Sequence, residues 1–411
     1  MLGSTLSRFI AASGLTNLGD GIATLAWAWV ATLLTRDPML IAAVPVALRL
    51  PWPLLALIAG VVTDRVDRRR LILAMDILRA AGFAGVALAL LLALPLPPAP
   101  AEGLASVPAF AALMIAALLV GSAEVFRDNA AQTMLPALVP PARLEQANGR
   151  LWSVELIGNA LIGPALGALL IGAFVPLPFA VNALCYGCAA MILWRIAGSF
   201  RPAASGAPRH WRRELAEGLA FLRAAPLLRT LAWLTGLWNL FFQMVMVALL
   251  LHAQENLGIE AEAYGLILAA GALGGIAGGL LGERVVRALG PARTAQWMLL
   301  ASAPTFAAIA LVPGPWALAL VMVAFEFTGL VWNTVSVSTR QRMIPDALLG
   351  RVNAIYRLLA WGMIPLGLVL SGLTMRLLDG PLPRAQALEA PFWIAAAGTL
   401  VTAALGWGAL G

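Results

Sequence analysis

Long apolar blocks separated by short polar breaks run along most of this chain. A helix needs about 20 predominantly apolar residues to cross the hydrocarbon core of a bilayer. Several breaks carry turn chemistry, for example Asp37-Pro38 and Pro313-Gly314-Pro315. The pattern therefore predicts twelve spanning helices, at about residues 9–34, 39–62, 71–94, 107–127, 151–173, 177–197, 228–252, 263–282, 294–312, 315–338, 353–377 and 391–410.

Composition agrees with this pattern. Of the 411 residues, 61% are hydrophobic and only 11% are charged, whereas soluble proteins carry about 25% charged residues. These values exclude a soluble globular protein, a disordered chain, a collagen and a disulfide scaffold, and they predict an all-α polytopic membrane protein. All 27 basic residues are Arg. A Walker A phosphate loop requires Lys, so we expect no P-loop ATPase.

The arginines also predict the orientation. They gather in loops on one side of the predicted helices, including residues 65–70 and 195–229, whereas the opposite loops hold only Arg36, Arg376 and Arg384. Because cytoplasmic loops carry an excess of basic residues, both termini are expected in the cytoplasm. The net charge of +7 then reflects these loops, and we expect no nucleic-acid partner.

The chain repeats itself at matching points of two six-helix halves. Leu15-Thr16-Asn17-Leu18, for example, resembles Leu237-Trp238-Asn239-Leu240. Between the halves, Arg212 to Ala225 could form an amphipathic helix on the membrane surface. The predicted organisation is an N-terminal half over residues 1–197, a cytoplasmic linker over 198–227 and a C-terminal half over 228–411.

This plan resembles the major facilitator superfamily of secondary transporters. The motif Gly60-Val-Val-Thr-Asp64-Arg65-Val-Asp67-Arg68-Arg69-Arg70 is similar to the signature between helices 2 and 3 of that superfamily. Asp67 replaces its usual second small residue, as in the branch with enterobactin exporters and macrolide efflux proteins. Leu18-Gly19-Asp20-Gly21 and Gly350-Arg351-Val352-Asn353-Ala354 also resemble that branch. The resemblance implies two pseudo-symmetric halves, alternating access, a bacterial inner membrane and a monomer.

The signature loop is expected to act as a conformational gate. Asp64 ends the second predicted helix on the expected cytoplasmic side. The eleventh predicted helix begins on the same side, just after Arg351. A helix N-terminus favours a nearby anion by about 0.3–1 kcal/mol. The resemblance implies that such a link closes the inner side. The alternative is that the arginines only enforce topology. The gate candidates are Gly60, Asp64, Arg65, Arg68, Glu283, Arg284 and Arg351.

Ionisable residues inside spans cost roughly 2.5–3.5 kcal/mol each and need a partner or a purpose. Asp20 and Glu326 lie deep in their spans, and we expect them to be the first and second proton-coupling sites. Alternatively, Asp20 is a structural partner of Arg49, which is the expected buried counter-ion or an anion-binding residue.

The resemblance implies that helices 1, 4, 7 and 10 line a central cavity. Asn17, Asp20, Thr24 and Trp27 share one helical face. Glu124, Arg127, Asp128 and Glu155 lie near helix ends and are expected to form a solvated intracellular network. The cavity candidates are Asn17, Thr24, Trp27, Trp238, Asn239, Gln243, Met246, Trp332 and Asn333.

Other signals predict packing only. Glycines recur every four residues within 263–282 and favour close helix contact over phosphate binding. The pair Cys185 and Cys188 lies in an apolar run without further metal ligands nearby, so we expect no metal and no cofactor. The sequence lacks His-Glu-x-x-His and Gly-x-Ser-x-Gly, which argues against an enzyme.

The predicted function is proton-coupled export of a small amphipathic molecule, such as a drug, a macrolide or a siderophore. The expected partners are this substrate, protons and the lipid bilayer. Two alternatives remain: a lipid or lysolipid transporter of the same fold, and a membrane receptor or scaffold that transports nothing.

Overall fold

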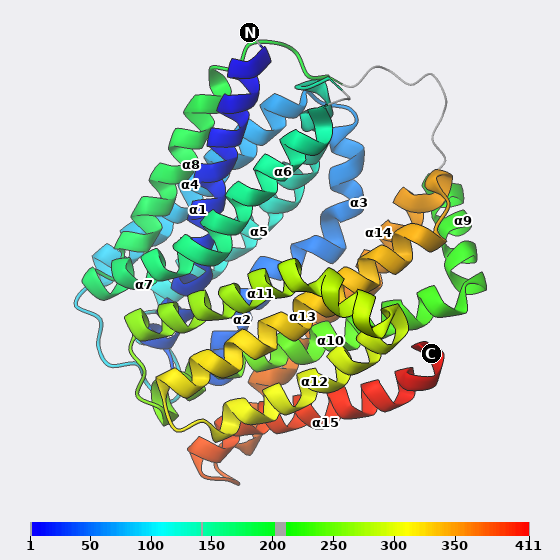
Figure 1. Cartoon of the computed structure of the whole chain (residues 1–411). Helices are drawn as coiled ribbons and strands as arrows, with labels where there is room; N and C mark the ends of the chain where they lie inside the picture. Colours follow the sequence, from blue (N-terminus) through cyan, green and yellow to red (C-terminus); the bar gives the residue numbers. More distant parts are fainter. Residues whose placement is uncertain (1, 141–142, 202–210, 411) are drawn as a thin grey trace. The chain divides into compact units, whose positions relative to one another are not determined.

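The computed structural model describes residues 2–140, 143–201 and 211–410, which are helical over most of their length (Figure 1). They divide into two compact units. The first comprises Met1–Ala204 with Glu260–Ala269, and the second comprises Ser205–Ile259 with Ala270–Gly411.

The first unit contains nine main helical segments among its described residues. They are α1 (Leu2–Leu34), α2 (Pro38–Arg49), α3 (Pro51–Thr63), α4 (Arg68–Ala93), α5 (Val107–Met134), α6 (Leu144–Glu155), a π-helix (Leu156–Ile162), α7 (Gly163–Ala173) and α8 (Leu177–Trp194).

The second unit contains the remaining helices, with α11 starting in the first unit. They are α9 (Trp211–Ala224), α10 (Pro226–Leu251), a π-helix (His252–Asn256), α11 (Ala261–Leu289), α12 (Pro291–Leu311), α13 (Pro315–Met343), α14 (Asp346–Leu378) and α15 (Arg384–Leu410).

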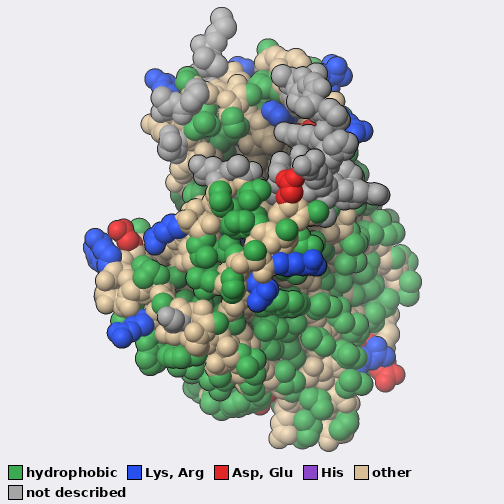
Figure 2. Space-filling model, turned by 90° about the vertical axis from the view of Figure 1, so that its right-hand side faces the viewer, with side chains coloured by type: hydrophobic (Ala, Val, Ile, Leu, Met, Phe, Trp, Pro, Cys, Tyr) green, Lys and Arg blue, Asp and Glu red, His purple; other side chains and the backbone are tan. Residues whose placement is uncertain are grey.

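Eleven segments of the described chain are long and apolar enough to cross a membrane. The remaining predicted span, the first at 9–34, lies within α1, which has 33 residues. The all-α polytopic fold is therefore confirmed. Large apolar side chains such as Leu92, Leu280 and Leu405 are exposed, and Figure 2 shows such side chains covering much of one face. In a membrane this surface contacts lipid.

Two spans do not continue as a single regular α-helix. The second breaks at Leu50, where Pro51 starts α3 and cannot continue the hydrogen bonds of α2. The fifth passes through the π-helix between α6 and α7. There a Cβ on Gly163 would lie 2.4 Å from the Cα of Gly21, so these glycines allow α1 and α7 to pack in close contact.

The predicted glycine packing is confirmed, and the predicted amphipathic segment is helical. A Cβ on Gly274 of α11 would lie 2.1 Å from the Val323 carbonyl oxygen of α13. The amphipathic segment forms α9, and Leu222 on it packs in an apolar cluster that includes Leu228 and Val352.

Candidate functional site

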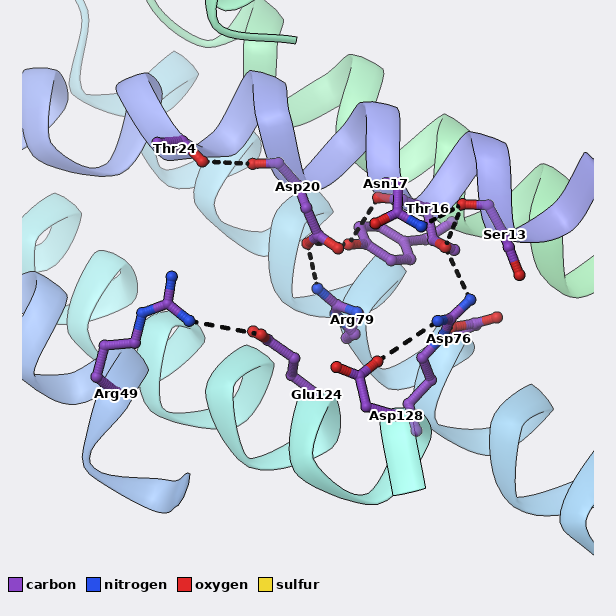
Figure 3. A network of polar contacts seen from close by, with 12 residues as sticks. Ser13, Thr16, Asn17, Asp20, Thr24, Arg49, Asp76, Arg79, Glu124 and Asp128 are labelled. Carbon is purple, nitrogen blue, oxygen red and sulfur yellow. Dashed lines mark hydrogen bonds and ion pairs between the residues drawn. The ribbon is translucent and has the colours of Figure 1, made fainter. Parts of the chain in front are cut away.

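A charged network lies between the helices of the first unit (Figure 3). Its centre is an ion pair between Asp20 of α1 and Arg79 of α4. The hydroxyl of Tyr186, on α8, donates to the same carboxylate oxygen, and the Arg79 guanidinium lies 4.3 Å from the centre of the Tyr186 ring. The Arg79 side chain is 1% exposed, whereas that of Asp20 is 28% exposed. Three helices therefore converge on one carboxylate.

Arg127 of α5 forms a second centre. Its Nε lies 3.4 Å from Asp76 Oδ1, and its Nη1 lies 3.5 Å from Asp128 Oδ1. Its Nη2 donates to the Thr16 hydroxyl at 2.8 Å. Asp76 is fully buried and Arg127 nearly so. The expectation of a solvated network is therefore wrong for Arg127, because α5 turns this guanidinium inward against α1 and α4, whereas Glu124 and Asp128 are partly exposed and Glu155 is exposed.

Arg49 was expected to be a buried counter-ion, and the structure corrects this. Its side chain is 52% exposed and pairs with Glu124 of α5, with Nη1 3.6 Å from Oε1. It is the last residue of α2, before the break at Pro51. Asp20 is instead paired with Arg79, so the alternative of an Asp20–Arg49 pair is also wrong.

The network holds more acids than bases. Asp20, Asp76, Glu124 and Asp128 face Arg49, Arg79 and Arg127. Neither oxygen of Asp76 has a hydrogen-bond partner among the described residues. An uncompensated buried charge costs several kcal/mol, and one added proton would bring this set of side chains to neutrality.

Sequence reasoning did not single out Asp76, Arg79 or Tyr186. For the first two a signal existed, because both are ionisable, lie within one predicted span and are three residues apart, which places them on the same side of a helix. Tyr186 gave no comparable signal, since a phenol in a span is compatible with ordinary packing.

The cavity candidates of α1 differ in exposure. Thr24 is exposed, and its hydroxyl donates to the Asp20 carbonyl at 2.9 Å. Asn17 is half-buried and donates to the Ser13 carbonyl at 2.8 Å. Trp27 is buried between Phe83 and Phe179, with ring centres 5.3 and 5.2 Å away. The structure places Trp27 in the apolar core, so it does not line a cavity here.

The candidates of α10 are half-buried. Trp238 Nε1 donates to the Ser302 hydroxyl at 3.2 Å, and its ring centre lies 5.0 Å from that of Phe242. Asn239 donates to the Ala360 carbonyl at 2.9 Å. Gln243 and Met246 follow at helical spacing.

On α13, Glu326 is half-buried. A Cβ on Gly271 would lie 3.3 Å from its Cγ. Asn333 is exposed. Trp332 is 2% exposed within an apolar cluster, so this second tryptophan is also a core residue, contrary to expectation.

The gate candidates lie at helix ends. Gly60 accepts the backbone N–H of Asp64, which caps α3, and Asp64 and Arg65 are exposed. Arg68 Nη1 donates to the Thr133 carbonyl at 2.9 Å. The two candidates of α11, Glu283 and Arg284, are exposed, with Glu283 3.7 Å from Arg287. The Arg351 side chain is outside the described residues, so the gate link stays a prediction.

Within the part of the chain that the structure describes, no three His, Cys, Asp or Glu side chains are grouped as metal ligands. Cys185 and Cys188 are both free thiols.

The fold is shared with solved transporters. A point mutant of the nucleoside transporter NupG has a TM-score of 0.77 at 12% identity and covers 100% of both chains. A bacterial homologue of the iron transporter ferroportin, in an inward-facing state, has a TM-score of 0.75 at 17% identity. This match covers 100% of our chain and 99% of the homologue. This likeness shows a shared fold, and the spans are those of a multi-pass membrane protein.

The chain belongs to the transmembrane secretion effector family, whose model matches residues 4–407. It is 28% identical to the multidrug efflux pump Tap of Mycolicibacterium fortuitum over 389 residues, which cover 91% of this chain and 88% of that protein. It is 29% identical to the enterobactin exporter EntS of Shigella boydii over 318 residues, which cover 73% and 68%. The family and these relatives are transporters rather than enzymes.

Proposed function

We propose that this protein exports small amphipathic molecules across a bacterial inner membrane in exchange for protons, by alternating access. The observation that carries the proposal is the buried network around Asp20 and Arg79, in which carboxylates outnumber guanidiniums. The efflux functions named for the relatives Tap and EntS support the direction of transport.

Asp20 is the first proton site in this proposal. A proton on its carboxylate removes the charge that holds Arg79 and weakens the bond from Tyr186, so the contact among α1, α4 and α8 depends on protonation. The 28% exposure of the Asp20 side chain provides an approach for the proton. Glu326 in the second unit is the second site, because its carboxylate is half-buried within a span.

The side chains around these acids suit an amphipathic substrate. In the first unit, Asn17 and Thr24 supply polar groups beside Asp20. In the second unit, the rings of Trp238, Phe242 and Phe325 pack in series, with centres 5.0 and 5.1 Å apart. Aromatic faces and carboxylates together favour bulky apolar or cationic compounds. Asp64, Arg65 and Arg351 are the proposed inner gate, and both termini face the cytoplasm in a monomer.

A panel assay in inverted membrane vesicles tests this proposal. A proton gradient is imposed, and ethidium, erythromycin and a catecholate siderophore are added in turn to vesicles with wild type or Asp20→Asn. We expect at least one compound to dissipate the gradient with wild type and not with Asp20→Asn. Asp37→Asn is the matched control, because Asp37 caps α2 by accepting from Met39 N and Asn caps equally well.

A response that Asp20→Asn retains in full would remove Asp20 from the coupling. If no compound responds while fluorescent lysolipid is moved, the lipid transporter is the correct alternative. If nothing is moved under any gradient, a receptor or scaffold replaces the proposal.

A further inference from the structure

Asp67 makes contacts in two directions. Its Oδ1 accepts from the backbone N–H of Arg70 at 3.0 Å and so caps the N-terminus of α4. Its Oδ2 accepts from the backbone N–H of Phe200 at 2.8 Å and from the Ser199 hydroxyl at 3.2 Å. Residues 195–200, which follow α8, are called the linker base here. One carboxylate therefore joins the loop between α3 and α4 to the linker base.

Two arginines also bond the linker base. Arg8 Nη1 donates to the Arg195 carbonyl at 3.1 Å, and Arg69 donates to the Ile196 carbonyl. These carbonyls lie at the C-terminal end of α8, where cations are favoured. Ile196 is fully buried in the apolar cluster that also contains Phe9 and Leu193. The linker base is thus fixed by apolar packing as well as by Asp67.

The charge state of Asp67 suits this role. Its side chain is 6% exposed. Burial alone raises the pKa of Asp67. The hydrogen bonds from Phe200, Arg70 and Ser199 together lower this pKa by more than burial raises it, so the pKa lies below the ordinary value of 3.8. Asp67 therefore keeps its charge and both acceptor oxygens at cytoplasmic pH.

We propose that Asp67 is a positioning residue, which couples the loop carrying Asp64 and Arg65 to the linker base, so that loop, linker base and end of α8 move together. A small residue at position 67 could accept neither set of bonds. The replacement noted in the motif therefore adds the bonds to Ser199 and Phe200 to the contacts that the Arg68 amide and the Arg69 side chain make with the linker base. The importance of this coupling for transport rests on the gate proposed above, but the coupling itself does not.

Hydrogen exchange of backbone amides tests the coupling without any substrate. Asp67→Asn keeps one oxygen for the cap of α4 and loses the second acceptor. With this variant we expect at least tenfold faster exchange at Phe200. We also expect faster exchange at Asp64, Arg65 and Val66, whose amides bond within the turn that ends α3. Amides of α12, in the second unit, should not change.

Asp37→Asn is again the matched control, since it changes a capping carboxylate in the same unit, and it should leave all these rates unchanged. Ser199→Ala removes one of the two linker bonds and should give a smaller increase at the same amides. If Asp67→Asn does not fold, Ser199→Ala alone still tests the connection. Wild-type rates at Phe200 in these variants would overturn the connection, and faster exchange at Phe200 alone would overturn the coupling to the loop. Because no transport is measured, neither result depends on proton-coupled export.

Discussion

Removal of Arg79 should destabilise the first unit strongly. Loss of one member of a buried ion pair leaves the other charge uncompensated and costs about 3–5 kcal/mol. Arg79 is 1% exposed, but Asp20 is 28% exposed and so remains partly solvated. We therefore expect Arg79→Gln to lower the free energy of unfolding by about 3 kcal/mol, the lower end of this range. In a unit of this size that corresponds to a decrease in Tm on the order of 6–12 °C. Thermal unfolding of the purified protein in detergent, followed by tryptophan fluorescence, measures it.

Two further variants separate this pair from general damage. Asp20→Asn with Arg79→Gln removes both charges, so the double variant should recover most of the lost stability. Arg49→Gln removes a partly exposed pair with Glu124 and should cost only about 0–1 kcal/mol. The reasoning is refuted if the double variant is no more stable than Arg79→Gln, or if Arg49→Gln is equally destabilising.

Three other predictions follow from the packing and from Asp67. Trp27→Ala should lower the free energy of unfolding by about 3–5 kcal/mol, because it empties the space between Phe83 and Phe179; a loss below ~1 kcal/mol in thermal unfolding would contradict its core position. Gly163→Leu should abolish the folded, monodisperse peak in size-exclusion chromatography, since even a Cβ would lie 2.4 Å from Gly21 Cα, and normal elution of this variant would contradict the α1–α7 contact. Because the pKa of folded Asp67 is lowered from 3.8, its stabilising effect is fully present above that value and disappears as the pH falls through the folded-state pKa. The Tm difference between wild type and Asp67→Asn should therefore be constant from pH 5 to 8, and a difference that changes within this range would contradict the assignment.

The fold was largely predictable because the bilayer imposes a simple constraint. Backbone polar groups must be satisfied within each span, so apolar length alone located the helices, and proline marked ends such as Pro38 and Pro315. The π-helix at Leu156–Ile162 was not predicted. It depends on the contact of α1 with Gly158 and Gly163, which is tertiary information.

The candidate site was predicted only in part, for a related reason. Depth along a span can be counted from the sequence, and this identified Asp20 as a residue in need of a partner. The rotation of neighbouring helices cannot be counted in this way, and it determines that Arg79 rather than Arg49 faces Asp20. The same unknown rotation explains why Trp27 and Trp332 were assigned to a cavity although both are core residues.

The most direct test of the central claim measures protons moved by substrate. Purified protein is reconstituted in liposomes that contain a pH-sensitive dye, with the membrane potential clamped to zero, and a gradient of a compound found active in the panel is applied. The account predicts that the flow of this compound drives protons in the opposite direction with wild type and with Asp37→Asn, and that Asp20→Asn abolishes this proton flow. Substrate movement by wild type without any change of internal pH, or full proton movement by Asp20→Asn, would contradict it.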